Sequence, residues 1–166
     1  MNFEDALSRL RQTKEEEDAF AASIPQQRED WVSAIEGLYH EVEEAITESA
    51  QAPVPLPCKK SSANIDDGSL GKYVVPTLEI SLYSEKLQFQ PSGTMLVGAA
   101  GIVEMSLDRR GASKKVEFVR LVQDGKPSNV WTIRLSTGLR SAPTTQGNPE
   151  VVSRETIRNA ILYLLG

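Results

Sequence analysis

The sequence predicts an α+β fold in which an N-terminal helical pair precedes an antiparallel sheet of four to six strands and a C-terminal helix. Apolar residues recur at helical spacing at both ends of the chain, and alternating apolar and polar residues fill much of the second half. Short turns separate these alternating runs, as in antiparallel sheets, whereas parallel strands need long crossover connections. The order of helices, strands and a final helix therefore favours an antiparallel sheet over a doubly wound parallel one.

Composition divides the chain into three segments. Residues 1–51 are an acidic helical segment, residues 52–71 a Pro-rich connector and loop, and residues 72–166 the sheet with its C-terminal helix. The first segment has thirteen acidic and four basic residues, a formal charge of −9, whereas the remainder has ten acidic and fourteen basic residues, a charge of +4. This division favours acidic helices packed on a mildly basic sheet. It is also compatible with an acidic segment that binds a basic partner, or with a sheet that binds an anion.

The acidic segment contains two helical stretches. Asn2 is a candidate N-cap for the first, whose apolar row is interrupted by the polar run at residues 14–18: Phe3, Ala6, Leu7, Leu10, Phe20, Ala21. Ser23 is a candidate N-cap for the second, with Pro25 in its first turn. Its apolar row is clearer: Trp31, Ile35, Leu38, Val42, Ile46. The two stretches can form a hairpin at residues 23–25 or continue as one kinked rod.

The connector and the strands follow from local signals. Proline stands at every second position from Pro53 to Pro57 and ends the helix, and the polar residues 58–71 predict a loop. We place the centre of the sheet at residues 87–107, and the Asp124-Gly125 dipeptide predicts a tight hairpin turn. Ser153 is a candidate N-cap for the final helix, whose buried row is predicted to be Ile157, Ala160, Ile161 and Leu164. Helices that cover the sheet unequally can leave one face open.

The sequence lacks the residues that phosphate-binding loops, metal sites and nucleophilic triads usually require. Gly93, Gly98 and Gly101 are not followed by the Lys-Ser/Thr pair and helix of a phosphate-binding loop. With His40 as the only histidine and Cys58 as the only cysteine, we expect no metal site and no cofactor. A nucleophilic triad would have to use His40, which lies on the polar side of its helix. Whether the protein is an enzyme stays open, with the residues favouring a non-enzymatic role.

A single cysteine and the absence of a signal sequence or a long apolar run predict a soluble, cytoplasmic protein with no membrane partner. We do not expect a nucleic-acid partner either. The aromatic residues near the basic hairpin, Phe118 and Trp131, fit the core of the sheet equally well.

Our leading functional hypothesis is a non-enzymatic interaction protein that pairs through its N-terminal helices with itself, as a homo-oligomer, or with a partner protein. Its candidate partner-binding residues are Trp31, Tyr39, Glu36 and Glu43.

The alternative is a small-molecule or nucleotide (anion) binding domain, in which a basic hairpin holds the anion: Arg109, Arg110, Lys114, Lys115. A third hypothesis is a small enzyme that uses carboxylates such as Asp66, Asp67 and Glu104, although their spacing does not favour it.

Overall fold

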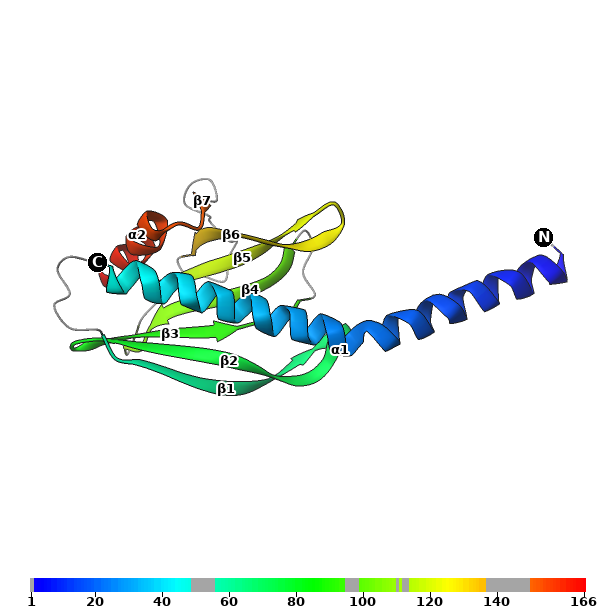
Figure 1. The fold of residues 1–166 in the computed structure, drawn as a ribbon, viewed down its shortest axis with the longest axis horizontal. Coiled ribbons are helices and arrows are strands. Elements are labelled where there is room, and N and C mark those ends of the chain that lie inside the picture. The colour runs from blue at the N-terminus through cyan, green and yellow to red at the C-terminus, as the bar shows by residue number, and fades with distance from the viewer. Residues whose placement is uncertain (1, 49–55, 95–98, 110, 112–113, 137–149) are drawn as a thin grey trace.

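A computed structural model describes residues 2–48, 56–94, 99–109, 111, 114–136 and 150–166. In these residues two helices, α1 (Phe3–Thr47) and α2 (Arg154–Leu165), accompany one open antiparallel sheet (Figure 1). Each strand pairs with the next along the chain: β1 (Cys58–Asp67), β2 (Gly71–Leu82), β3 (Glu85–Pro91), β4 (Ala99–Leu107), β5 (Lys115–Gln123), β6 (Lys126–Ser136), β7 (Glu150–Val151). A short 3-10 turn, η1 (Gly68–Leu70), connects β1 to β2. The predicted α+β class and antiparallel sheet are confirmed.

The described part of the chain has seven strands, so the predicted four to six was wrong. The largest miss is β1, which occupies ten residues of the segment expected to be a loop and pairs with β2 from Cys58 to Asp67. Because β1 is an edge strand with mostly exposed side chains, its sequence lacks the apolar alternation that marks a half-buried strand. The two-residue β7 pairs only with Thr132 and Ile133 of β6 and is too short to show a pattern.

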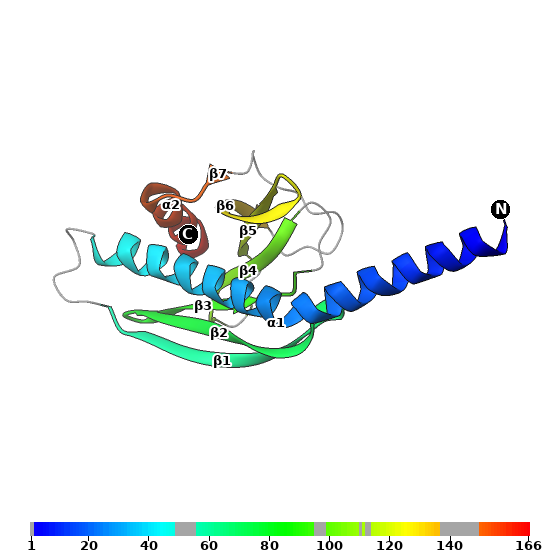
Figure 2. The same ribbon diagram turned by 45° about the vertical axis from the view of Figure 1, so that its right-hand side comes forward.

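The predicted N-terminal helical pair is one helix, α1, of 45 residues with Pro25 inside it, so the kinked rod is found and the hairpin alternative was wrong. Proline cannot donate a backbone hydrogen bond to the carbonyl four residues earlier, so it kinks a helix without having to end it. Figures 1 and 2 show that α1 bends between its N-terminal half and the half that lies on the sheet. Ser23 does not cap a helix, since its hydroxyl donates to the Phe20 carbonyl at 2.7 Å and accepts from Gln27 Nε2 at 2.7 Å.

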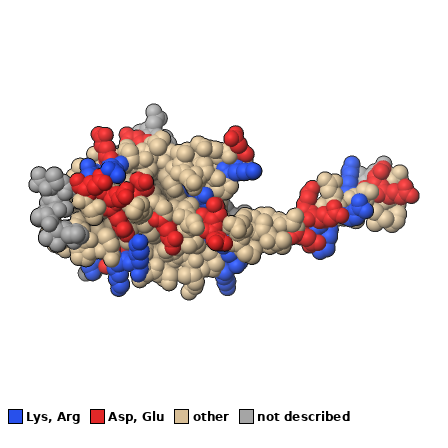
Figure 3. All heavy atoms as spheres, viewed as in Figure 1, with Lys and Arg blue, Asp and Glu red and all other residues tan. Residues whose placement is uncertain are grey.

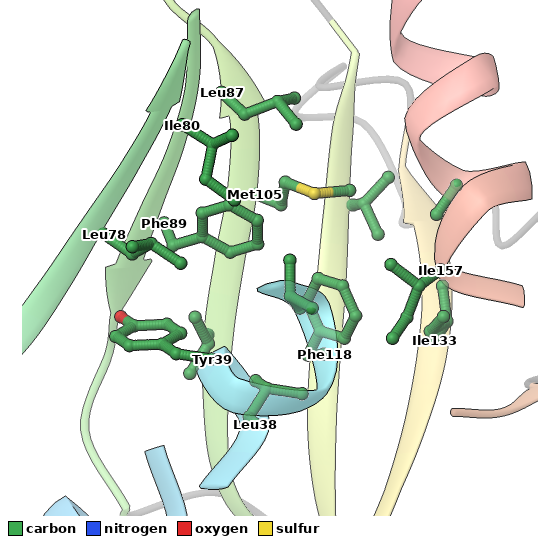
Figure 4. Packing of buried hydrophobic residues seen from close by; sticks show 14 of the residues in the cluster. Leu38, Tyr39, Leu78, Ile80, Leu87, Phe89, Met105, Phe118, Ile133 and Ile157 are labelled. Atoms are coloured by element: carbon green, nitrogen blue, oxygen red, sulfur yellow. The ribbon is translucent and has the colours of Figure 1, made fainter. Parts of the chain in front are cut away.

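The hydrophobic core lies between one face of the sheet and both helices. From α1 it takes Trp31, Ala34, Ile35, Leu38, Tyr39, Val42, Ala45 and Ile46. Figure 4 shows Tyr39 of α1 beside Phe89 of β3, with Phe118 of β5 and Ile157 of α2 further along the same layer. The Tyr39 hydroxyl also donates to the Pro76 carbonyl of β2 at 2.8 Å, so this buried polar group is satisfied.

Two local predictions are confirmed. Ser153 caps α2 by accepting a hydrogen bond from the Thr156 backbone, and all four apolar residues of the predicted row are buried. Asp124 and Gly125 have φ angles of 52° and 73°, the left-handed pair that a tight hairpin turn requires, and they connect β5 to β6.

No helix of the described chain covers the other face of the sheet. That face carries cross-strand ion pairs, Glu79 with Lys86 at 3.8 Å and Glu104 with Lys115 at 3.8 Å. A third pair joins Glu117 to Arg134. Alternation of buried and polar residues along β3, β4 and β5 therefore separates a core face from a charged face.

Trp31 packs tightly between α1 and the sheet. Its ring stacks on Trp131 of β6, with centroids 5.8 Å apart, and lies against the backbone of Gly101 in β4. A Cβ atom at position 101 would stand 2.3 Å from the Trp31 ring, well inside van der Waals contact. Gly101 is therefore required for α1 to seat on the sheet.

We predict that Gly101→Ala destabilises the fold by about 1–3 kcal/mol, because the added methyl group must displace the Trp31 ring from a packed core. Urea unfolding measures this change. The matched control is Gly37→Ala in α1, where nothing lies within 4 Å of the added Cβ. Removing the conformational freedom of a helical glycine should stabilise the protein by up to about 1 kcal/mol. Equal effects at both positions would show that Trp31 does not pack on Gly101 as described.

Candidate interaction surface

The N-terminal half of α1 extends beyond the sheet as a free helical arm, which we define as residues 3–22 (Figures 1 and 2). Every residue of the arm is exposed except Ala6, which is partly exposed. Its large apolar side chains stand open to solvent, with exposed fractions of 76% for Phe3, 66% for Leu10, 49% for Leu7 and 45% for Phe20. The arm is therefore an apolar helix surface without a partner in the described chain.

Three of these residues, Phe3, Leu7 and Leu10, begin a row along one side of the arm, and Phe20 lies beside that row. We call the row the seam; it includes two charged residues and ends just beyond the arm: Phe3, Leu7, Leu10, Lys14, Glu17, Ala21, Ile24. The spacing alternates between four and three residues, as in helices that pack on other helices. It continues without a phase break through Arg28 into the buried row of Trp31, Ile35 and Leu38. The same spacing thus continues along both halves of α1, but the sheet covers only the second half.

Charged residues stabilise the arm locally. Lys14 Nζ lies 3.2 Å from Asp18 Oδ1, and Arg11 Nε lies 3.6 Å from Glu15 Oε1, both one helical turn apart. Asn2 caps the helix together with Asp5. Figure 3 shows acidic and basic side chains close together along this part of the molecule. Exposed pairs contribute only a few tenths of a kcal/mol each, so the arm remains a marginally stable helix until it is packed.

A polar cluster anchors the base of the arm to the sheet. Arg28 Nε donates to the Leu70 carbonyl at 2.7 Å, and its guanidinium lies 5.4 Å from the Tyr73 ring centre. Arg120 of β5 is almost fully buried, where Nε donates to the Ser128 carbonyl at 2.6 Å and Nη1 pairs with Asp30 Oδ2 at 3.0 Å. These contacts hold the segment of α1 just after the bend. They therefore fix the position at which the arm leaves the rest of the described chain, which we call the body.

A buried carboxylate, Asp67, holds the neighbouring turns together. Asp67 accepts from the Thr94 backbone at 2.8 Å, from the Thr94 hydroxyl at 2.8 Å and from the Tyr73 hydroxyl at 2.6 Å. Burial, followed by the hydrogen bond and the negative charge of Asp67, raises the pKa of Tyr73 well above its usual value. Asp67 is thus a structural acceptor. Asp66 is exposed, and Glu104 pairs with Lys115 on the charged face of the sheet.

Open cavities lie beside α1, one at the base of the arm and one further along the half that packs on the sheet. One of about 570 Å³ is lined by Gln26, Trp31, Ala100, Arg120 and neighbouring side chains, and one of about 670 Å³ lies between α1 and the edge of β6. Asp30 borders both, and its charge is opposed by Arg120. No cluster of three or more potential metal ligands occurs in the described residues. Neither helix there has the length and apolarity that crossing a bilayer requires.

The structure separates the four predicted partner-binding residues. Trp31 and Tyr39 are both 1% exposed and belong to the core of the chain itself. Glu36 is exposed on the outer side of α1, and Glu43 is partly buried with Lys60 Nζ 3.5 Å away. Their role in binding stays a prediction. Sequence reasoning did not choose the exposed apolar residues of the arm, although the polar residues that interrupt their row already distinguish it from the buried row.

The predicted anion-binding hairpin has partners for each described cation. Arg109 lies 3.0 Å from Glu85, and Lys115 lies 3.8 Å from Glu104. Lys114 donates to the Tyr163 carbonyl at 3.2 Å, near the C-terminal end of α2, where cations are favoured. Arg110 lies outside the described residues. The structure thus brings Arg109 and Lys114 to one small cavity, but it directs their charges toward protein groups.

Cys58 and His40 each interact with other side chains and do not form a nucleophile–base pair. Partial burial and then the negative charge of Glu43 raise the pKa of the Cys58 thiol, while Lys60 lowers it, so the adjacent lysines do not produce a reactive thiolate. His40 Nε2 lies 2.9 Å from Glu44 Oε1 on the exposed side of α1.

We predict that Asp30→Asn destabilises the protein by about 1–3 kcal/mol, because it leaves the buried Arg120 guanidinium without its counter-charge. Glu29→Gln, the same chemical change at the adjacent exposed residue, should alter the free energy of unfolding by less than about 0.5 kcal/mol. Urea unfolding of both variants compares them directly. If the two changes have the same effect, the Arg120–Asp30 pair does not anchor the base of the arm.

Comparison with known proteins identifies no relative that could assign a role to these residues: no family model, curated protein or solved structure matches the chain.

Proposed function

We propose that the protein is a non-enzymatic interaction protein whose N-terminal arm binds a helix of another chain, either a second copy or a partner protein. The observation that carries this proposal is the exposed seam, in which Phe3, Leu7 and Leu10 form an apolar row on a helix with nothing packed against it in the described chain. The body supplies a rigid base, because α1 runs from the arm into the core without interruption.

Apolar burial provides the driving force. A single exposed leucine is ordinary on a protein surface, but a contiguous apolar row marks an interaction site. Complete burial of a leucine or phenylalanine side chain contributes about 1.5–3 kcal/mol. Three such residues on consecutive turns can therefore support a reversible helix–helix contact, and packing would also stabilise the arm as a helix.

The alternative of anion binding has less support. The described basic residues of the β4–β5 hairpin already contact carboxylates or the end of α2, so an anion would have to displace these partners. Within the described chain, by contrast, the apolar seam residues Phe3, Leu7 and Leu10 stay largely exposed, so a bound helix would displace nothing from them.

We predict that a photo-activatable phenylalanine analogue at Leu10 forms a covalent adduct with another protein chain in cells that express the protein. Leu10 lies in the seam and is 66% exposed, so a helix bound there lies within reach of the probe. Mass spectrometry of the adduct distinguishes a second copy from a different protein.

The matched control places the same probe at Gln12, an exposed position almost on the opposite side of the helix. We expect little adduct there. Leu7→Glu together with Leu10→Glu should remove the adduct, measured with the probe at Phe3, and leave the free energy of unfolding of the body unchanged, because neither leucine contacts the core. Equal adduct yields at Leu10 and Gln12 would contradict the proposal.

A further inference from the structure

We infer that the helix bound by the arm is the arm of a second copy of this chain, packed antiparallel in one register. This inference rests on the proposed function and adds the identity and orientation of the partner. It is carried by the two charged residues of the seam, Lys14 and Glu17, which interrupt an otherwise apolar row.

The two charges exclude a parallel, in-register pair. In such a pair every seam residue meets its own copy. Lys14 would face Lys14 and Glu17 would face Glu17, so both polar layers would set like charges against each other. Juxtaposed like charges suppress association.

An antiparallel pair removes the like-charge contacts from both polar layers. Lys14 and Glu17 have opposite charges and are three residues apart, so one antiparallel alignment places Lys14 of each copy against Glu17 of the other. In the same alignment Leu10 faces Ala21 and Leu7 faces Ile24, which makes the layers next to the ion pairs apolar, and only the outermost layer sets an apolar residue, Phe3, against a charged one, Arg28. The polar interruption thus becomes two reciprocal ion pairs at the centre of the contact.

Other antiparallel registers are worse. Sliding one helix by seven residues in one direction sets Leu10 against Lys14 and Leu7 against Glu17. Sliding it in the other direction sets Lys14 against Ile24 and Glu17 against Ala21. Each shift packs charged side chains on apolar ones without a counter-charge, which costs free energy. The charges therefore select a single register, as buried polar residues do in coiled coils.

The shape of the molecule permits this arrangement. The arm extends away from the body, so two overlapping arms leave the two bodies at opposite ends of the pair (Figures 1 and 2). Lys14 pairs with Asp18 of its own helix, and its side chain is 72% exposed. Both seam charges are therefore accessible to a second helix.

Sedimentation velocity of the full chain tests the inference through charge reversal. We expect a reversible dimer for the wild type. Lys14→Glu and Glu17→Lys each make both polar layers repulsive, so each variant alone should raise the dimer dissociation constant by about tenfold or more. An equimolar mixture of the two variants restores opposite charges in both layers between unlike chains. The mixture should therefore dimerise about as tightly as the wild type.

Glu15→Lys is the matched control. It reverses a charge and breaks an ion pair with Arg11 within the helix, as Lys14→Glu breaks the pair with Asp18, but Glu15 lies away from the seam. We expect its dissociation constant to stay within about threefold of the wild type. Weakening by Glu15→Lys equal to that by Lys14→Glu would attribute the effect to helix stability and overturn the inference.

Engineered cysteines test the orientation. After Cys58→Ser removes the exposed native thiol, a chain that carries both Leu7→Cys and Ile24→Cys should form disulfide-linked dimers under oxidising conditions. Chains with either cysteine alone should stay unlinked. Cross-linking by Leu7→Cys alone would indicate a parallel pair and overturn the inference.

A wild-type chain that remains monomeric at every concentration would likewise overturn it. The proposed function would survive that result if the probe at Leu10 captured a different protein. It would fail with the inference if the probe captured nothing.

Discussion

The structure depends on a mismatch between the length of α1 and the sheet that supports it. The helix has 45 residues, but its buried side chains lie only between Trp31 and Ile46. Packing of an amphipathic face, more than intrinsic propensity, stabilises helices in proteins. The second half of α1 obtains this packing from the sheet and α2, whereas the arm continues the row with apolar residues and two charges that stay exposed in the described chain. The core and the proposed interaction surface are therefore two parts of one continuous row.

Local patterns predicted the elements whose structure depends on local interactions. The row from Trp31 to Ile46, the Asp124-Gly125 turn and the Ser153 cap all follow from spacing, turn chemistry or capping. Two features depend on distant partners: β1 was missed, and the choice between a hairpin and a kinked rod at Pro25 stayed open. The polar strand β1 forms because β2 offers it a full set of backbone partners. Pro25 is compatible with the first turn of a new helix or with a kink inside an existing one, and only the tertiary packing on both sides of it decides between them.

The candidate site could be predicted only in part, for a related reason. Residues three and four apart produce the same pattern whether they pack on the chain itself or on another molecule, so spacing did not distinguish Trp31 from Leu10. The large aromatic side chains were natural candidates for binding, but the sheet lies directly under them. The basic hairpin was ambiguous because the partners of its cations, such as Glu85 for Arg109, come from strands distant in sequence. The charged residues Lys14 and Glu17, which interrupt the seam, were the one feature of the sequence that indicated an exposed helix.

The central claim is that the arm is held by another helix, and hydrogen–deuterium exchange of the full chain at several protein concentrations tests it most directly. At high concentration the amides of residues 3–22 should exchange slowly, and they should exchange faster on dilution, while amides of residues 31–46 stay protected throughout. If the arm amides exchange at the rate of an unpacked helix at every concentration, and the protein's cellular partners do not slow them, the arm is not an interaction surface.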